Sequence, residues 1–213
     1  GEVDVRGRVQ EGEVGAGNVQ KMGQENDILY CATDWYGMAT GDVPNVATML
    51  ADMSFFPTLP DRVQQGMLAQ LFLARLLKDP RGFASAAAFQ AGGKPLLQPG
   101  TVYYDGNSQG GIIGGALLAV SQDITRGVLG VPGMTYSLLL IRSSDFAPYA
   151  AFLYPAYPNQ LTRPLLLALI QMLWDRSEPN GYAQHMTTNT LPGTPAHTVL
   201  IHEAFGDHQV ANV

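Results

Sequence analysis

The chain contains one cysteine, Cys31, among 213 residues, and this excludes an internal disulfide. Charged residues make up only 14% of the sequence. No apolar stretch reaches about 18 residues, the minimum for a transmembrane helix. The charges sum to −6, which disfavours nucleic acid and anionic membrane surfaces as partners. We therefore expect no nucleic-acid partner and no stable membrane insertion.

Hydrophobic residues, by contrast, make up 46% of the chain, enough for one domain with a substantial core. Short β-type runs alternate with runs of helical spacing, and this order is typical of a parallel α/β sheet. Residues 134–196 are too long for one crossover, so they are predicted to form a cap-like insert within a single domain, 1–213. The predicted strands are 27–33, 101–104, 127–131 and 198–202, and the main predicted helices are 61–78, 109–121 and 164–174.

The stretch GNSQG, residues 106–110, lies between a predicted strand and a predicted helix. A G-x-S-x-G pattern in that position is typical of a nucleophile elbow, a sharp turn that exposes the serine hydroxyl above the sheet. Side chains at the two flanking positions would clash in such a turn, so Gly106 and Gly110 fit it. Ser108 is therefore the predicted nucleophile.

The helix that follows Ser108 should direct free backbone N–H groups at the same place. The N–H of Gln109 is then the predicted donor to an oxyanion. One such donor stabilises a transition state by roughly 3 kcal/mol. The alternative is that GNSQG is a glycine-rich turn that only permits tight packing, with Ser108 an incidental polar residue.

A serine nucleophile needs a base, and the base needs an orienting acid. In this type of fold the chain order is Ser, then Asp or Glu, then His. Asp207 follows the last predicted strand and is the predicted acid, although it could instead cap a turn, and Asp175 is its rival. Only His208 follows Asp207, which makes it the predicted base within this chain. An adjacent acid and base require unusual loop geometry.

Several long runs resemble a family of bacterial α/β-hydrolases that are esterase- or lipase-like. They include CATDWYGMATGDVPNVATMLADMSFFPTLPDRVQQG, YYDGNSQGGIIGGAL, LIQMLWDRSEPNGYAQHM and LPGTPAHTVLIHEAFGDHQVANV, and the resemblance covers about residues 13 to 213. It implies an α/β-hydrolase fold, with Ser108 as nucleophile and Asp207 as triad acid.

The chain departs from that family at both ends. Family members carry a His-Gly motif at the oxyanion-hole loop, where this chain reads VDVRGRVQEG. They also continue past GDHQVANV, and their catalytic histidine lies in that continuation. We therefore expect the chain to be the central part of a longer hydrolase, unless His208 or His202 serves as the base.

Together these features predict a serine hydrolase that cleaves carboxylic esters through an acyl-enzyme on Ser108. The partner would be a small-molecule ester or lipid, and no metal or other cofactor is predicted, since metal-ligand spacings are lacking. The alternatives are a truncated, non-catalytic scaffold or binding protein, and amide hydrolysis by the same site. The sequence leaves the oligomeric state open, a homo-oligomer included.

Overall fold

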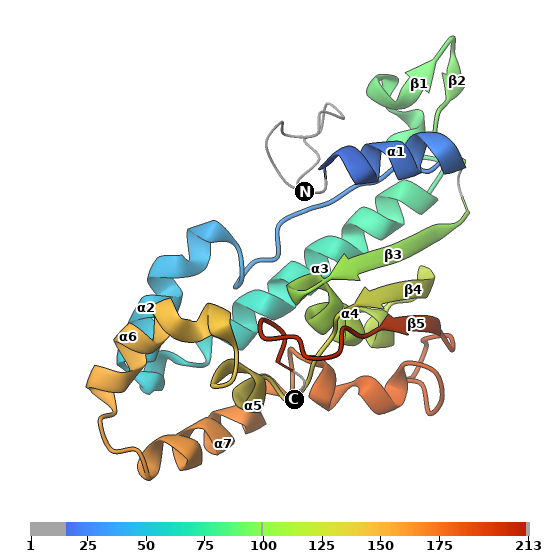
Figure 1. Cartoon of the computed structure of the whole chain (residues 1–213). Helices are drawn as coiled ribbons and strands as arrows, with labels where there is room; N and C mark the ends of the chain where they lie inside the picture. Colours follow the sequence, from blue (N-terminus) through green and yellow to red (C-terminus); the bar gives the residue numbers. More distant parts are fainter. Residues whose placement is uncertain (1–15, 99, 212–213) are drawn as a thin grey trace. The chain divides into compact units, whose positions relative to one another are not determined.

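The computed structural model describes residues 16–98 and 100–211 (Figure 1). The chain divides into two compact units where the sequence predicts one domain. The first unit comprises Gly1–Asp34 and Ala69–Thr101, and the second comprises Trp35–Leu68 and Val102–Val213. Residues 134–196 lie wholly in the second unit, as do Ser108, Asp207 and His208.

The first unit contains little sheet. Its elements are α1 (Ala16–Asn26), the end of α3 (Thr58–Lys78), two 3₁₀ turns and an antiparallel pair, β1 (Gln90–Ala91) with β2 (Lys94–Pro95). The strand predicted at residues 27–33 is wrong: this segment forms no strand, and Ile28 and Leu29 are about half exposed. An apolar run predicts burial in a sheet only if a neighbouring strand pairs with it, and the run itself carries no information about that neighbour.

The second unit is built on a three-stranded parallel sheet, in the order β3 (Val102–Asn107), β4 (Ile124–Gly130), β5 (Thr198–His202). The predicted strands at 101–104, 127–131 and 198–202 are confirmed. Asn107 pairs with Gly130 and Gly130 pairs with His202. The carboxyl ends of all three strands therefore lie at one edge of the sheet, which confirms a mixed α/β class.

Helix α4 (Gln109–Val120) packs against β3 and β4 (Figure 1). Its residues Gly111–Ala119 are all buried, because the sequence QGGIIGGALLAV has no charged residue and little bulk. A Cβ at Gly111 would lie 2.2 Å from the carbonyl oxygen of Gly130, and one at Gly114 would lie 2.4 Å from the Tyr104 ring. These glycines let the helix approach the sheet closely.

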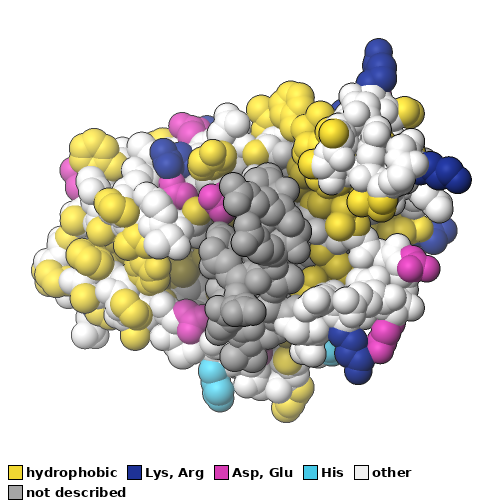
Figure 2. All heavy atoms as spheres, turned by 90° about the horizontal axis from the view of Figure 1, so that it is seen from above, with side chains coloured by type: hydrophobic (Ala, Val, Ile, Leu, Met, Phe, Trp, Pro, Cys, Tyr) yellow, Lys and Arg dark blue, Asp and Glu magenta, His cyan; other side chains and the backbone are white. Residues whose placement is uncertain are grey.

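The other helices of the second unit are α2 (Val43–Ala51), the start of α3, α5 (Tyr136–Leu140), α6 (Ala147–Ala156) and α7 (Thr162–Trp174). The helices predicted at 61–78 and 164–174 are confirmed within a few residues. Helix α2 packs against α6, and α5 packs against α7. Figure 2 shows hydrophobic side chains on the surface over α2 and α6, where Val43, Phe152 and Tyr154 are exposed.

Candidate active site

Ser108 occupies a strained turn between β3 and α4. Its backbone has φ 56° and ψ −118°, a conformation that residues other than glycine rarely adopt. The turn is fixed from both sides: the Ser108 N–H donates to the Gly130 carbonyl at 3.0 Å, and the Ser108 carbonyl accepts from Ile112 N–H at 2.9 Å. The half-buried serine hydroxyl has no hydrogen-bond partner among residues 16–98 and 100–211. Ser108 therefore lies at a strained strand-to-helix turn with its hydroxyl unpaired.

Of the two glycines that flank Ser108, Gly106 has no room for a side chain, whereas Gly110 has room for a methyl group. A Cβ on Gly106 would lie 2.4 Å from the Gly110 carbonyl oxygen and 2.5 Å from the Tyr104 hydroxyl. A Cβ on Gly110 would meet only the Tyr104 hydroxyl, at an ordinary 3.6 Å. The prediction that Gly110 must lack a side chain is therefore wrong for a single methyl group, because the helix has already turned away from the strand.

Gln109 is the first residue of α4, and its N–H has no backbone partner in the described part of the chain. The first N–H groups of a helix lack intrahelical acceptors and carry its positive partial charge. Gln109 and Ser108 line the same cavity. An anionic oxygen formed at Ser108 would therefore find a donor within the turn itself.

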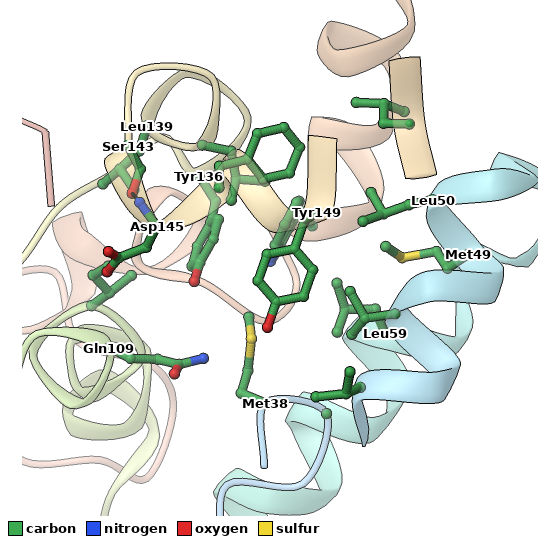
Figure 3. A pocket seen from close by; sticks show the side chains of 18 of the residues that line it. Met38, Met49, Leu50, Leu59, Gln109, Tyr136, Leu139, Ser143, Asp145 and Tyr149 are labelled. Atoms are coloured by element: carbon green, nitrogen blue, oxygen red, sulfur yellow. Dashed lines mark hydrogen bonds between the residues drawn. The ribbon is translucent and has the colours of Figure 1, made fainter. Parts of the chain in front are cut away.

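The cavity beside Ser108 has a volume of about 420 Å³, within the range of small-molecule sites. Its wall is predominantly apolar, and Asp145 carries the only charged side chain among the described residues that form it. Figure 3 shows Gln109 on one side of the cavity and Met49 and Leu50 of α2 on the other, with the Met38 side chain pointing toward Tyr149. The lining also includes residues of the 134–196 segment, among them Tyr136, Leu139, Phe146, Tyr149, Leu167 and Trp174.

The loop that contributes Gly37–Thr40 to the cavity is held by a buried carboxylate. Asp42 is almost completely buried, and its Oδ2 accepts the N–H groups of Gly37 at 2.7 Å and Ala39 at 3.1 Å. Arg62 donates from Nε to the other oxygen at 2.5 Å and adds a contact from Nη2. The sequence analysis did not predict these hydrogen bonds of Asp42, although an aspartate in a glycine-containing loop often accepts backbone N–H groups in a turn.

Asp207 and His208 lie in the loop after β5, beside residues that line the cavity. Gln209 and Val210 are part of the lining, and their N–H groups donate to Asp207 Oδ1 at 2.7 and 3.0 Å. Asp207 therefore caps the turn through Oδ1, the alternative foreseen for it, while Oδ2 has no hydrogen-bond partner among the described residues and is left for a base. The carbonyl of His208 accepts the Ser144 N–H at 2.8 Å, while its side chain is exposed and is not part of the lining.

The other three histidines have separate environments. His197 is buried, with Nε2 3.0 Å from the Ser121 carbonyl oxygen, beyond the end of α4 farthest from Ser108. A helix of 12 residues spans about 18 Å. His185 Nδ1 contacts the Asn189 carbonyl, and His202 is exposed at the end of β5, two strands from Asn107. No histidine is among the described residues that line the cavity.

Glu178 is a fully buried carboxylate behind the cavity wall. Its Oε1 accepts from the Tyr136 N–H at 3.3 Å and from Gln171 Nε2, and its Oε2 accepts from the Asn180 N–H at 3.2 Å. Gln171 in turn accepts the Ser137 N–H at 3.0 Å. This network fixes the start of α5, which carries Tyr136 and Leu139 into the cavity wall. No sequence motif signalled it.

Burial raises the pKa of Glu178 above its ordinary value of 4.5, although its hydrogen bonds act in the opposite direction. The folded state therefore retains the proton to a higher pH than the unfolded chain. We expect the free energy of unfolding to fall as pH rises from 4.5 through the folded-state pKa. Glu178→Gln, which cannot titrate, should remove that part of the slope in denaturant titrations at successive pH values.

An unchanged slope in Glu178→Gln would contradict the assignment of this pH dependence to Glu178.

Comparisons with known proteins add no relative: no family model matches the chain, and no similar curated protein or solved structure was found. Among residues 16–98 and 100–211, no helix has the length and apolar character needed to cross a membrane. The same residues bring together no group of three or more His, Cys, Asp or Glu side chains that could hold a metal ion.

Proposed function

We propose that the protein is a serine hydrolase of the α/β-hydrolase type that cleaves carboxylic esters through an acyl-enzyme on Ser108. The observation that carries the proposal is the left-handed backbone of Ser108 at a strand-to-helix turn, beside an apolar cavity. A serine is held in such a conformation at a cost of about 1–3 kcal/mol, and such strain clusters at active sites.

In the proposed reaction, the Ser108 hydroxyl attacks the ester carbonyl, and the Gln109 N–H stabilises the tetrahedral oxyanion. The alcohol then leaves with a proton from the base, and water hydrolyses the acyl-enzyme by the same steps in reverse order. The apolar wall of the cavity would surround the acyl group. Its volume fits a short or medium-length chain.

We assign the acid and base roles to Asp207 and His208. The loop that holds them also contributes Gln209 and Val210 to the cavity wall, so it lies beside the nucleophile's site. The exposed ring of His208 must turn toward Ser108 to take its proton. In the register of the sheet, His202 is the other histidine at the carboxyl edge.

A second function is favoured by one observation. Because no histidine ring lines the cavity, the same fold could bind an apolar ligand without cleaving it. In that case Ser108 would have the reactivity of an ordinary serine.

Labelling with a fluorophosphonate distinguishes the two functions, because the probe reacts with activated serines. We expect one adduct, located at Ser108 by peptide mass spectrometry and absent from Ser108→Ala. A folded protein that remains unlabelled would support the binding function and contradict the hydrolase.

The labelling rate also tests the base. General-base catalysis contributes on the order of 100-fold or more, so His208→Ala should slow labelling by at least that factor. His202→Ala, the matched change at the end of β5, should leave the rate within about twofold of the wild type. An unchanged rate in His208→Ala would show that His208 is not the base.

A further inference from the structure

Trp174 forms part of the cavity wall at the end of α7, and only 2% of its surface is exposed. Its indole Nε1 is enclosed and has no hydrogen-bond partner among the described residues. A ligand in the cavity would therefore meet the ring of Trp174 and not its N–H.

Two tyrosine hydroxyls face the same space. In Figure 3, the phenol oxygens of Tyr136 and Tyr149 point into the part of the cavity bordered by Met38 and Gln109. Neither hydroxyl has a hydrogen-bond partner in residues 16–98 and 100–211. Burial and the nearby Glu178 raise the pKa of Tyr136, so its hydroxyl keeps its proton and can donate.

Both tyrosine rings are held by neighbouring aromatic rings. The Tyr136 ring stacks on Trp174 with centroids 4.4 Å apart, and the Tyr149 ring stacks on Phe146 at 6.4 Å. The Glu178 network fixes the backbone of Tyr136 from behind. These hydroxyls are therefore held in position before any ligand arrives, in a wall that is predominantly apolar.

We propose that the cavity is selective for acyl chains that carry a hydrogen-bond acceptor oxygen along the chain, such as a keto, hydroxyl or ether oxygen. This inference rests on the proposed hydrolase function, because it names the acyl group that the site prefers. The oxygen accepts from the Tyr136 or Tyr149 hydroxyl, while the remaining methylene groups contact the apolar wall.

The alternative ligand, an unsubstituted alkyl chain, leaves these donors unpaired as it displaces water from them. A site that hydrogen-bonds a substrate group discriminates strongly against the analogue that lacks it, whereas an apolar pocket distinguishes small changes in length only weakly. Selectivity for the oxygen should therefore exceed selectivity for chain length.

The experiment compares nitrophenyl octanoate with esters of the same length that carry a keto group at successive carbons. We expect one keto position to raise kcat/KM about tenfold above octanoate, the effect of roughly one added hydrogen bond. Tyr136→Phe, which removes one oxygen and keeps the stacked ring, should reduce that advantage at least threefold. Tyr154→Phe is the control, since Tyr154 is exposed and lies outside the cavity. Equal rates at every keto position, or equal effects of Tyr136→Phe on both ester types, would overturn the inference.

Binding separates this inference from the hydrolase itself. In Ser108→Ala protein, calorimetry with dipropyl ketone should show binding that Tyr136→Phe weakens about fivefold or more and Tyr154→Phe leaves unchanged. Ketone binding without hydrolysis of any ester would contradict the proposed function and retain the acceptor site. Hydrolysis of octanoate without ketone binding would retain the function and overturn the acceptor site.

Discussion

Ser108→Ala is expected to lower the hydrolysis of an activated ester on the order of 10⁶-fold, to the background rate. The methyl group that replaces the hydroxyl cannot form the acyl-enzyme, and the remaining members of a triad contribute little without the nucleophile. The fold should be unaffected, since the hydroxyl has no hydrogen-bond partner in the described part of the chain. Turnover of a nitrophenyl ester and a denaturant titration measure the two effects.

Ser144→Ala provides the matched control. Ser144 is an exposed serine outside the cavity, and its side chain makes no hydrogen bond in the described part of the chain. Its backbone N–H donates to the His208 carbonyl at 2.8 Å, a bond that alanine retains. Loss of the Ser144 hydroxyl should leave turnover unchanged. Wild-type turnover in Ser108→Ala would show that another group is the nucleophile and that the strained turn has a purely structural role.

Gly106→Ala should destabilise the protein by about 3 kcal/mol or more, a large part of the stability of an ordinary domain. The added Cβ would lie 2.4 Å from the Gly110 carbonyl oxygen, and that oxygen also accepts a 2.6 Å hydrogen bond from the Tyr104 hydroxyl. Because both are parts of the turn, neither can move without displacing Ser108. Activity should therefore fall together with stability.

Gly110→Ala supplies the comparison within the same five residues. Its Cβ has room, and alanine is favoured over glycine in a helix by about 0.5–1 kcal/mol. We expect its unfolding free energy to equal or exceed that of the wild type. Equal stability of Gly106→Ala and Gly110→Ala in denaturant titrations would contradict the steric account of the turn.

The strand-to-helix turn at Ser108 was predicted well because its constraints are local. A β-type run, a glycine before the serine and a small-residue helix after it occupy consecutive positions, so spacing alone locates β3, Ser108 and α4. The strand at 198–202 was predicted with its exact bounds for the same reason. The prediction of a strand at residues 27–33 was wrong because burial in a sheet depends on a partner strand far away in sequence.

The cavity could be predicted only in outline. The length of residues 134–196 predicted a cap-like insert, but the position of the Tyr136 hydroxyl depends on how α5 packs against α7. Asp42 and Glu178 are buried carboxylates whose partners come from other segments. The surroundings of Asp207 and His208 are likewise set by the contact of their loop with Ser143 and Ser144, which no motif encodes.

The order of strands in the sheet has a consequence for synthesis on the ribosome. Strands β3 and β4 and the helix between them are close in sequence, but β5 follows only after residues 131–197. Contacts between distant segments form slowly, because a long loop must close first. During translation, one edge of β4 therefore remains unpaired until β5 has been synthesised. The nascent chain is most prone to misassembly in this interval.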